Sequence, residues 1–535
     1  MSHALQAHDG GLAVQIVQEA GGWELVLKRG IQYTQSLLQQ FDDLTRRTEP
    51  ELLLMQSYLH AKLGDEALAL ELLRLAEVAV VAACDPRLRR DHLIIAALVH
   101  IYFDRIASDL YWPADGSAVS LLMPDDPLGQ GTLLCGTAVV ALATGRMADA
   151  SRAALDARTR MRLVGSPLGE NYCLIHLAQA LSATGQVATS RLRIDEALAL
   201  AETNFGTDSS LKALVGCFKA QHLYWQGQWL EAVPWLRGSQ DTLEHVDGWL
   251  DLFATSAEVS WRVALRHEGL QSALTLIDRA GQLARGRNLS RLARLVAAWR
   301  VDLLSQCSLL TQATNEASAA ALKEQLAAAS RPAEPAGLDW RFLEAGTLAL
   351  ARLQMAAGPA SAALTRLAET SARFEQAGLL LASWRLRLMA LLAQRRTQDR
   401  DVPPTLVRDV LAPILHNGLS GLLLETGPGI LPLLYQLEGT LPPQAMAVVG
   451  QLRGWQTHPP RPRAQFSAKE TEVLQLLVSG QANKAIARAL DISENTVKFH
   501  LKQVFLKLGV DNRTAAIGAA LQQGFVSSIR GSLDR

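Results

Sequence analysis

The sequence predicts an all-α protein, in which an α-solenoid of helical hairpins precedes a small C-terminal domain of four helices. Three observations support this fold class. The chain is rich in Ala and Leu and only 5% aromatic, which favours helices. Glycines recur at intervals of 40, 42 and 42 residues between apolar helical segments. Near the C-terminus, four short amphipathic segments each carry their own start and stop signals.

The spaced glycines define the predicted solenoid, which we expect to cover residues 1–454. Each glycine follows an apolar helical stretch and precedes a second one, so it can end one helix and let the next fold back. The period exceeds the 34 residues of a tetratricopeptide unit, and helices of about 16 residues would account for it. The glycines at the predicted turns are Gly64, Gly145, Gly185, Gly227, Gly269 and Gly358.

Two polar, proline-containing segments predict boundaries. Residues 394–404 (QRRTQDRDVPP) indicate a possible break late in the solenoid, before a final helical cap that runs to about Gly454. Residues 455–465 contain three prolines among basic residues and read as a short, fairly stiff linker. The third predicted part, residues 466–530, is the C-terminal domain.

The first two helices of that domain have clear end signals. Ser467 and Glu470 form a capping box, Phe466 is placed as a hydrophobic staple, and Gly480 stands where a left-handed C-cap belongs. A shorter helix follows over about residues 483–490, with Ile486, Ala487 and Leu490 inward.

A tight turn at Asp491 and Ile492 leads to Ser493, a good N-cap for the third helix. Its apolar positions fall on one stripe, and Gly509 ends it. The fourth helix is expected from about Arg513 to Gln523 and stops at Gly524. The predicted stripe consists of Val497, Leu501, Val504, Phe505 and Leu508.

Burying this stripe leaves a polar face on the third helix that suits a DNA major groove. Lys498 and Lys502 lie one turn apart and can donate to guanine, while Phe499 can contact a thymine methyl group. We therefore expect Lys498, Phe499 and Lys502 to read bases. Side chains suited to phosphate oxygens surround them and position the helix. The expected phosphate contacts are Asn483, Lys484, Asn495, Thr496, His500 and Gln503.

These residues resemble the LuxR-type (GerE-like) helix-turn-helix domain. The similarity lies in the spaced motifs at residues 466–470, 480–487, 493–500 and 507–510, and covers about sixty residues. It departs mildly at Lys469, where Arg is usual, and Ala482, where Ser is usual. The resemblance implies double-stranded DNA as partner, RNA polymerase as a further partner, and a fourth helix that pairs two domains as a homodimer on an inverted repeat.

Charge is distributed in agreement with this interpretation. Residues 461–535 hold 11 Lys or Arg against 6 Asp or Glu, a net charge of +5, and the preceding 460 residues have a net charge of −5. A basic module attached to an acidic body suggests an anion-binding unit whose affinity falls steeply with salt.

The region from Gly21 to Gly64, including GGWELVLKRG, resembles the segment that follows the ATPase in large LuxR-type regulators of the maltose-activator kind. Those proteins combine a nucleotide-binding switch, an inducer-sensing helical superhelix and a DNA reader. No Gly-x-x-x-x-Gly-Lys-Ser/Thr motif occurs here, so no nucleotide or other cofactor is expected. A natural short relative and a piece of a longer protein both fit.

Several classes of function receive no support. No apolar run approaches the length that spans a bilayer, no signal-peptide pattern follows Met1, and a cytoplasmic protein is expected. The five scattered cysteines read as buried small hydrophobes. His60, His176, His222 and His267 lack metal-ligand spacing, and nothing indicates an enzyme.

The solenoid is expected to carry an effector, either a small molecule or a protein, on a concave surface. Some tryptophans could line such a groove, although filling hairpin cores is the preferred explanation. The candidates are Trp225, Trp229, Trp235, Trp261, Trp299, Trp340 and Trp384.

Together these features predict a LuxR-type, sequence-specific transcription regulator whose helical repeats control a C-terminal DNA reader. The alternative is an interaction scaffold whose helix-turn-helix is vestigial or makes protein contacts.

Overall fold

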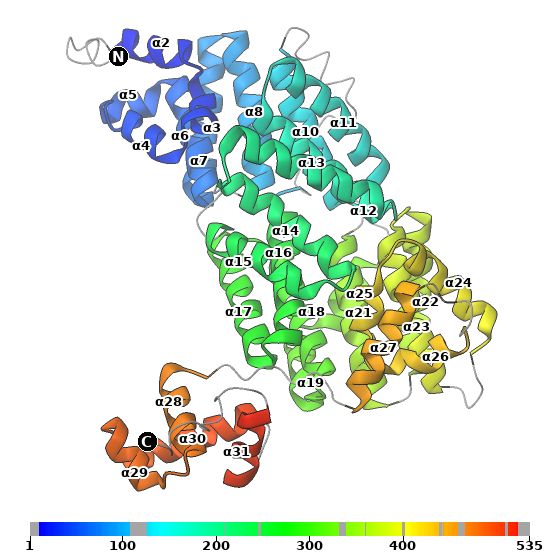
Figure 1. The fold of residues 1–535 in the computed structure, drawn as a ribbon. Helices are drawn as coiled ribbons and strands as arrows, with labels where there is room; N and C mark the ends of the chain where they lie inside the picture. Colours follow the sequence, from blue (N-terminus) through cyan, green and yellow to red (C-terminus); the bar gives the residue numbers. More distant parts are fainter. Residues whose placement is uncertain are drawn as a thin grey trace. The chain divides into compact units, whose positions relative to one another are not determined.

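The computed structural model describes residues 10–106, 126–207, 209–243, 248–330, 339–358, 360–397, 402–437, 441, 443–457, 466–508 and 512–522. Throughout these ranges the regular structure is helical, which confirms the all-α fold class (Figure 1). The chain divides into two compact units, one of residues 1–263 and 274–457, and one of residues 264–273 and 458–535. Within the described ranges, no helix is long and apolar enough to cross a membrane.

The first unit begins with short helices that lead into longer ones. Aspartates cap several of them: the side chains of Asp65 and Asp85 accept from backbone amides in the first turns of α7 and α8. The helices are α2 (Gly10–Glu19), η1 (Gly22–Glu24), α3 (Leu25–Arg29), α4 (Ile31–Leu38), α5 (Asp43–Thr48), α6 (Pro50–Leu63), α7 (Glu66–Ala83) and α8 (Pro86–Tyr102).

Paired helices of 15 to 19 residues follow, close to the expected length. Asp126 and Ser166 cap two of them immediately before a proline at the first helical position, a favourable start for a helix. These helices are α10 (Pro127–Ala143), α11 (Met147–Leu163), α12 (Pro167–Ala183), α13 (Val187–Phe205), α14 (Ser210–Trp225), α15 (Trp229–Leu243), α16 (Leu250–His267) and α17 (Leu270–Gly286).

The remainder of the repeats is less regular, because long helices alternate with short ones. They are α18 (Ser290–Gln306), α19 (Leu310–Ala319), α20 (Leu322–Ala329), α21 (Trp340–Ala357), α22 (Ser361–Gln376), α23 (Leu380–Thr397), α24 (Pro404–His416), α25 (Ser420–Glu425), η2 (Gly427–Ile430), α26 (Leu431–Tyr435) and α27 (Pro443–Thr457).

Five of the six predicted turn glycines adopt the left-handed conformation, with φ between 78° and 98°. Gly185 also allows a close approach, because a Cβ there would collide with the Trp384 ring. Gly358 differs: its φ of 173° is extended backbone, so the turn after α21 does not need a left-handed residue. The glycine pattern therefore located that turn, although Gly358 does not share the left-handed conformation of the other five.

Helices far apart in the sequence contact each other within this unit. The Asn288 side chain donates to Glu66, and the Trp340 indole donates to the carbonyl of Leu142 at 2.8 Å. α14 packs against α25 so closely that a Cβ on Gly421 would collide with the backbone carbonyl of Tyr224. The repeats therefore have partners beyond their neighbours in sequence.

Three further expectations can be compared with the structure. The tryptophans mostly fill cores: Trp225, Trp229, Trp261 and Trp299 are buried, whereas Trp235, Trp340 and Trp384 are half-buried. The prediction that all five cysteines are buried holds for Cys173 and Cys217, but Cys135 and Cys307 are half-buried and Cys84 is exposed. The linker was expected from residue 455, yet α27 continues to Thr457, and residues 458–465 lie outside the described ranges.

The second unit contains α28 (Ala468–Val478), α29 (Asn483–Leu490), α30 (Glu494–Leu508) and α31 (Arg513–Gln522), which match the four predicted helices. The predicted stops at Gly509 and Gly524, and the side chain of Leu508, lie outside what the structure describes.

Candidate nucleic-acid interface

The capping box predicted at the start of α28 is present. The Ser467 hydroxyl accepts from the Glu470 amide at 3.2 Å, and Glu470 Oε2 accepts from the Ser467 amide at 2.6 Å. Phe466 packs on the small core of the domain, as a hydrophobic staple does. Gly480 has a φ of 83° and ends the helix in the left-handed conformation. These local signals fix where α28 begins and ends.

The core beneath the candidate interface is a cluster shared by all four helices. On α30, Val497, Leu501 and Val504 are buried and Phe505 is partly buried, so the predicted stripe is confirmed as far as Phe505. α28, α29 and α31 contribute the rest of the cluster: Val473, Leu474, Leu477, Ile486, Ala487, Ala516 and Ala520. Because α30 is held by this stripe, its opposite face is fixed outward.

The three expected base-reading side chains lie on that outward face. Lys498 and Lys502 are exposed, and Phe499 is 59% exposed, which is unusual for a large apolar ring. Phe499 contacts the His500 ring edge-on, with centroids 5.7 Å apart. Two ammonium groups and an apolar ring thus share one side of the helix, a combination suited to guanine acceptors and thymine methyl groups.

The expected phosphate contacts surround this face with different degrees of exposure. Asn495 and Lys484 are exposed, whereas Thr496, His500 and Gln503 are half-buried, so Gln503 is less open than expected. The Thr496 hydroxyl shares a 2.8 Å hydrogen bond with Ser493, whose oxygen also accepts from the Thr496 amide. Thr496 is therefore part of the N-cap of α30 as well as a candidate phosphate contact.

Arg513 is a residue of this site that the sequence interpretation missed. Its guanidinium donates to the carbonyl of Gln481 at 2.6 Å and to the amide oxygen of Asn483 at 3.4 Å. This contact ties the start of α31 to the turn before α29. The amide nitrogen of Asn483 is then the atom that can donate to a phosphate, next to the N-terminus of α29. The only signal for this role in the sequence was that Arg513 is the first residue of a predicted helix.

Ala482, where the family usually has Ser, occupies the N-cap of α29 without a side-chain cap. The backbone amides in the first turn of α29 therefore donate no hydrogen bond to an N-cap side chain. They are available to an anion, which helix N-termini favour.

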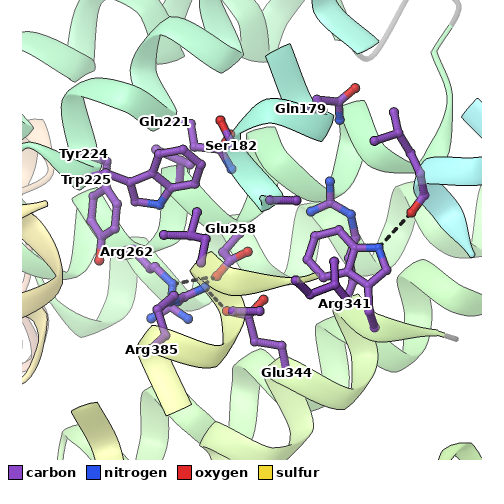
Figure 2. Close-up of a pocket in the computed structure, with 17 residues that line it drawn as sticks. Gln179, Ser182, Gln221, Tyr224, Trp225, Glu258, Arg262, Arg341, Glu344 and Arg385 are labelled. Carbon is purple, nitrogen blue, oxygen red and sulfur yellow. Dashed lines mark hydrogen bonds and ion pairs between the residues drawn. The ribbon is translucent and has the colours of Figure 1, made fainter. Parts of the chain in front are cut away.

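A second group of functional candidates lies in the repeats, where charged side chains are buried between helices. In Figure 2, Arg262 and Arg385 point toward Glu258 and Glu344. Arg262 lies 3.0 Å from Glu258 and 2.5 Å from Glu425, and Arg385 lies 2.6 Å from Glu344. The network connects α16, α21, α23 and α25, and sequence reasoning missed it because paired members such as Arg262 and Glu425 are 163 residues apart.

The surroundings decide how these carboxyls titrate. Burial alone would raise the pKa of Glu258, but Arg262 and Arg385 outweigh burial and hold it below its usual value. At Glu344, burial prevails over Arg385 and raises the pKa. The cavity beside them is only about 60 Å³. Because the charged side chains around this cavity already pair with one another, we interpret the network as a structural link between helices.

No group of three or more His, Cys, Asp or Glu residues in the described ranges is placed to hold a metal ion.

Comparison with known proteins agrees with the geometry of the small domain. Residues 464–520 match the family described as "Bacterial regulatory proteins, luxR family". The C-terminal domain is thus a LuxR-family helix-turn-helix domain of the kind found in DNA-binding regulators.

Individual relatives are regulators too. The chain is 49% identical over 51 residues to the putative HTH-type transcriptional regulator YhjB of Escherichia coli K12, covering 10% of this chain and 26% of the relative. It is 41% identical over 61 residues to the transcriptional regulatory protein DegU of Brevibacillus brevis, covering 11% and 26%. It is 31% identical over 116 residues to the probable transcriptional regulatory protein NarL of Mycobacterium tuberculosis H37Rv, covering 22% and 39%. The matches thus span 26% to 39% of these relatives' lengths.

Proposed function

We propose that this chain is a sequence-specific transcription regulator in which the helical repeats sense an effector and control the C-terminal DNA reader. The observation that carries the DNA-reading part is the exposed set of Lys498, Phe499 and Lys502 on a helix whose other face is locked into the domain core. Lys484 and Asn483 would hold the adjacent phosphates, and α31 would pair two copies on an inverted repeat.

Dimerisation is part of the proposal for an energetic reason. A single small domain buries too little surface on DNA to reach the affinity typical of specific regulators, and two half-sites double the contacts. Recruitment of RNA polymerase and a cytoplasmic location follow from the same role.

The test is selection of DNA from random duplexes by the full chain, followed by titration of the selected site. We expect an inverted-repeat motif, and its loss in the K498A/K502A double variant. Each lysine that contacts a base contributes about 1–3 kcal/mol of discrimination. The slope of log affinity against log salt falls by about 1 for each lost phosphate contact.

Lys469 provides the matched control. It is an exposed lysine of the same domain, about half exposed, and it pairs with Glu472 on α28. The K469A variant should retain the selected motif. Unchanged DNA footprints for K498A/K502A would overturn the base-reading assignment, and the absence of any recurring motif for the unmodified chain would favour an interaction scaffold.

A further inference from the structure

A large cavity lies in the N-terminal half of the repeats, and it is wider than the one beside the buried charges of Figure 2. Its volume is about 460 Å³, within the range of small-molecule sites. η1, α6, α8, α10, α11, α12, α13 and Trp249, the residue before α16, contribute to its walls. Six aromatic side chains line it: Trp23, Tyr58, Tyr102, Tyr172, Phe205 and Trp249.

These rings support one another, which keeps the walls in place. Trp23 and Tyr58 meet edge to face with centroids 5.8 Å apart. On the other side, Trp249 contacts both Tyr172 and His176 edge to face, at 5.8 and 5.0 Å. Such pairs are favourable beyond simple burial. These ring pairs therefore fix two parts of the cavity wall.

The charge of the lining restricts the ligand. Lysine and arginine are absent from the described lining residues, and Glu24 is the one carboxylate there. His176 is the one described lining side chain that can become cationic, and it is already hydrogen-bonded to Cys135, so an anionic ligand would lose its hydration without gaining an unpaired cation. Phosphorylated and carboxylated compounds are therefore poor candidates.

The polar groups of the lining argue against sugars. The Thr132 hydroxyl donates to the carbonyl of Leu128, and the Ser166 hydroxyl accepts from the Gly169 amide, so both already have partners. The Trp249 indole N–H is buried without a hydrogen-bond partner among the described residues. A sugar needs many partners, whereas this wall is mostly ring and methyl surface with few polar groups.

We propose that this cavity binds an uncharged, ring-containing small molecule and is the effector site of the repeats. The assignment as effector site rests on the proposed regulatory function, whereas the binding itself does not.

A matched pair of fluorescent probes tests the ligand class with the full chain. N-Phenyl-1-naphthylamine is neutral, and 8-anilino-1-naphthalenesulfonate carries the same ring system with an added sulfonate. We expect the neutral probe to bind one per chain and the sulfonate to bind more than about tenfold more weakly. Equal affinity for both probes, or no binding of the neutral one, would overturn the proposal.

Two neighbouring valines of α10 locate the binding. Val139 is buried in the cavity wall, whereas Val140 is half-buried and does not line the cavity. V139F fills the cavity and should weaken binding of the neutral probe by about tenfold or more, while V140F should leave it unchanged. Equal binding to both variants would contradict the assigned site.

Cys135 gives a readout that needs no variant. A hydrogen bond from Cys173, together with the nearby His176, lowers the pKa of Cys135, and its side chain is partly exposed, so its thiolate should react with N-ethylmaleimide. The neutral probe should protect Cys135, which lines the cavity, and leave the exposed Cys84 reactive. Equal reactivity of Cys135 with and without the probe would contradict occupancy of the cavity.

The two proposals fail separately. V139F should still select the same DNA motif, because residue 139 lies in the repeats. Probe binding without any DNA motif would leave the ligand site standing and reject the regulatory function. Selection of a DNA motif without probe binding would leave the regulatory function standing and reject the ligand site.

Discussion

Glu425 lies among three arginines, and removing its charge measures what the buried network contributes to stability. Its carboxylate is 2.5 Å from Arg262, 3.4 Å from Arg352 and 3.6 Å from Arg385, and its side chain is 5% exposed. The Glu425→Gln variant preserves side-chain size and removes the charge. It leaves one buried positive charge without its full compensation.

The expected loss follows from the contacts that remain. Arg262 retains Glu258, Arg385 retains Glu344 and Arg352 retains Asp302, so no arginine becomes isolated. Breaking a buried pair costs about 3–5 kcal/mol, and the remaining partners place the expected loss near the lower limit, about 3 kcal/mol. Solvent screens the interaction between these charges only weakly, because Arg262 is only 4% exposed.

Tryptophan fluorescence during chemical denaturation is a suitable assay. All 11 tryptophans lie at or before residue 455, so the signal reports unfolding of the repeats alone. Glu202→Gln is the control, since Glu202 is 44% exposed and pairs with Lys212 at 2.9 Å. It should cost less than about 1 kcal/mol. Similar losses for the two variants would refute the reasoning.

Three other predictions concern single residues. Burial raises the pKa of Glu51 from 4.5 to about 7, so its contribution to the stability of the fold should fall by about 2–3 kcal/mol as pH rises through this range. Asp104, whose pKa is also raised, titrates in the same range in both chains, so the fall in unfolding free energy between pH 5 and pH 8 should be about 2–3 kcal/mol smaller in E51Q than in the unmodified chain. G421A forces a methyl group into the backbone of α14 and should lower the unfolding free energy by about 1–3 kcal/mol in chemical denaturation. The control is G450A, where an added Cβ meets nothing within 4 Å, and it should be neutral or stabilising. Equal effects of the two variants would argue against the close helix contact. S467A removes one half of the capping box and should cost the C-terminal domain about 0.5–2 kcal/mol. The measurement is the loss of helical circular dichroism on heating, taken over the unfolding transition of that domain. No change in the transition would show that the cap is not stabilising.

The sequence predicted the C-terminal domain well because its signals are local. The capping box at Ser467 and Glu470 and the glycine at 480 act within one or two helical turns, so a single chain segment contains the whole interaction. The exposed face of α30 followed from the spacing of Val497, Leu501 and Val504 alone. Whether that face reads bases stays a prediction.

Interactions between distant segments could not be predicted in this way. Arg262 and Glu425 look like ordinary surface charges in sequence, and only the packing of α16 on later helices buries them together. The cavity beside Cys135 likewise needs rings from five separate helices and from Trp249, the residue before α16. Even Arg513, at the start of a predicted helix, acquired its role from a turn about 30 residues away.

The hydrogen bonds that connect early and late helices have a consequence for how the protein is made. Asn288 bonds to Glu66, Trp340 to Leu142, and Ser420 to Gln226, across 222, 198 and 194 residues. A purely linear array can fold from one end as it leaves the ribosome, because each repeat needs only its neighbour. Here the first repeats wait for residues synthesised some two hundred positions later. Folding should therefore be slow and completed only after most of the chain has emerged, with early repeats exposed meanwhile to chaperones and proteases.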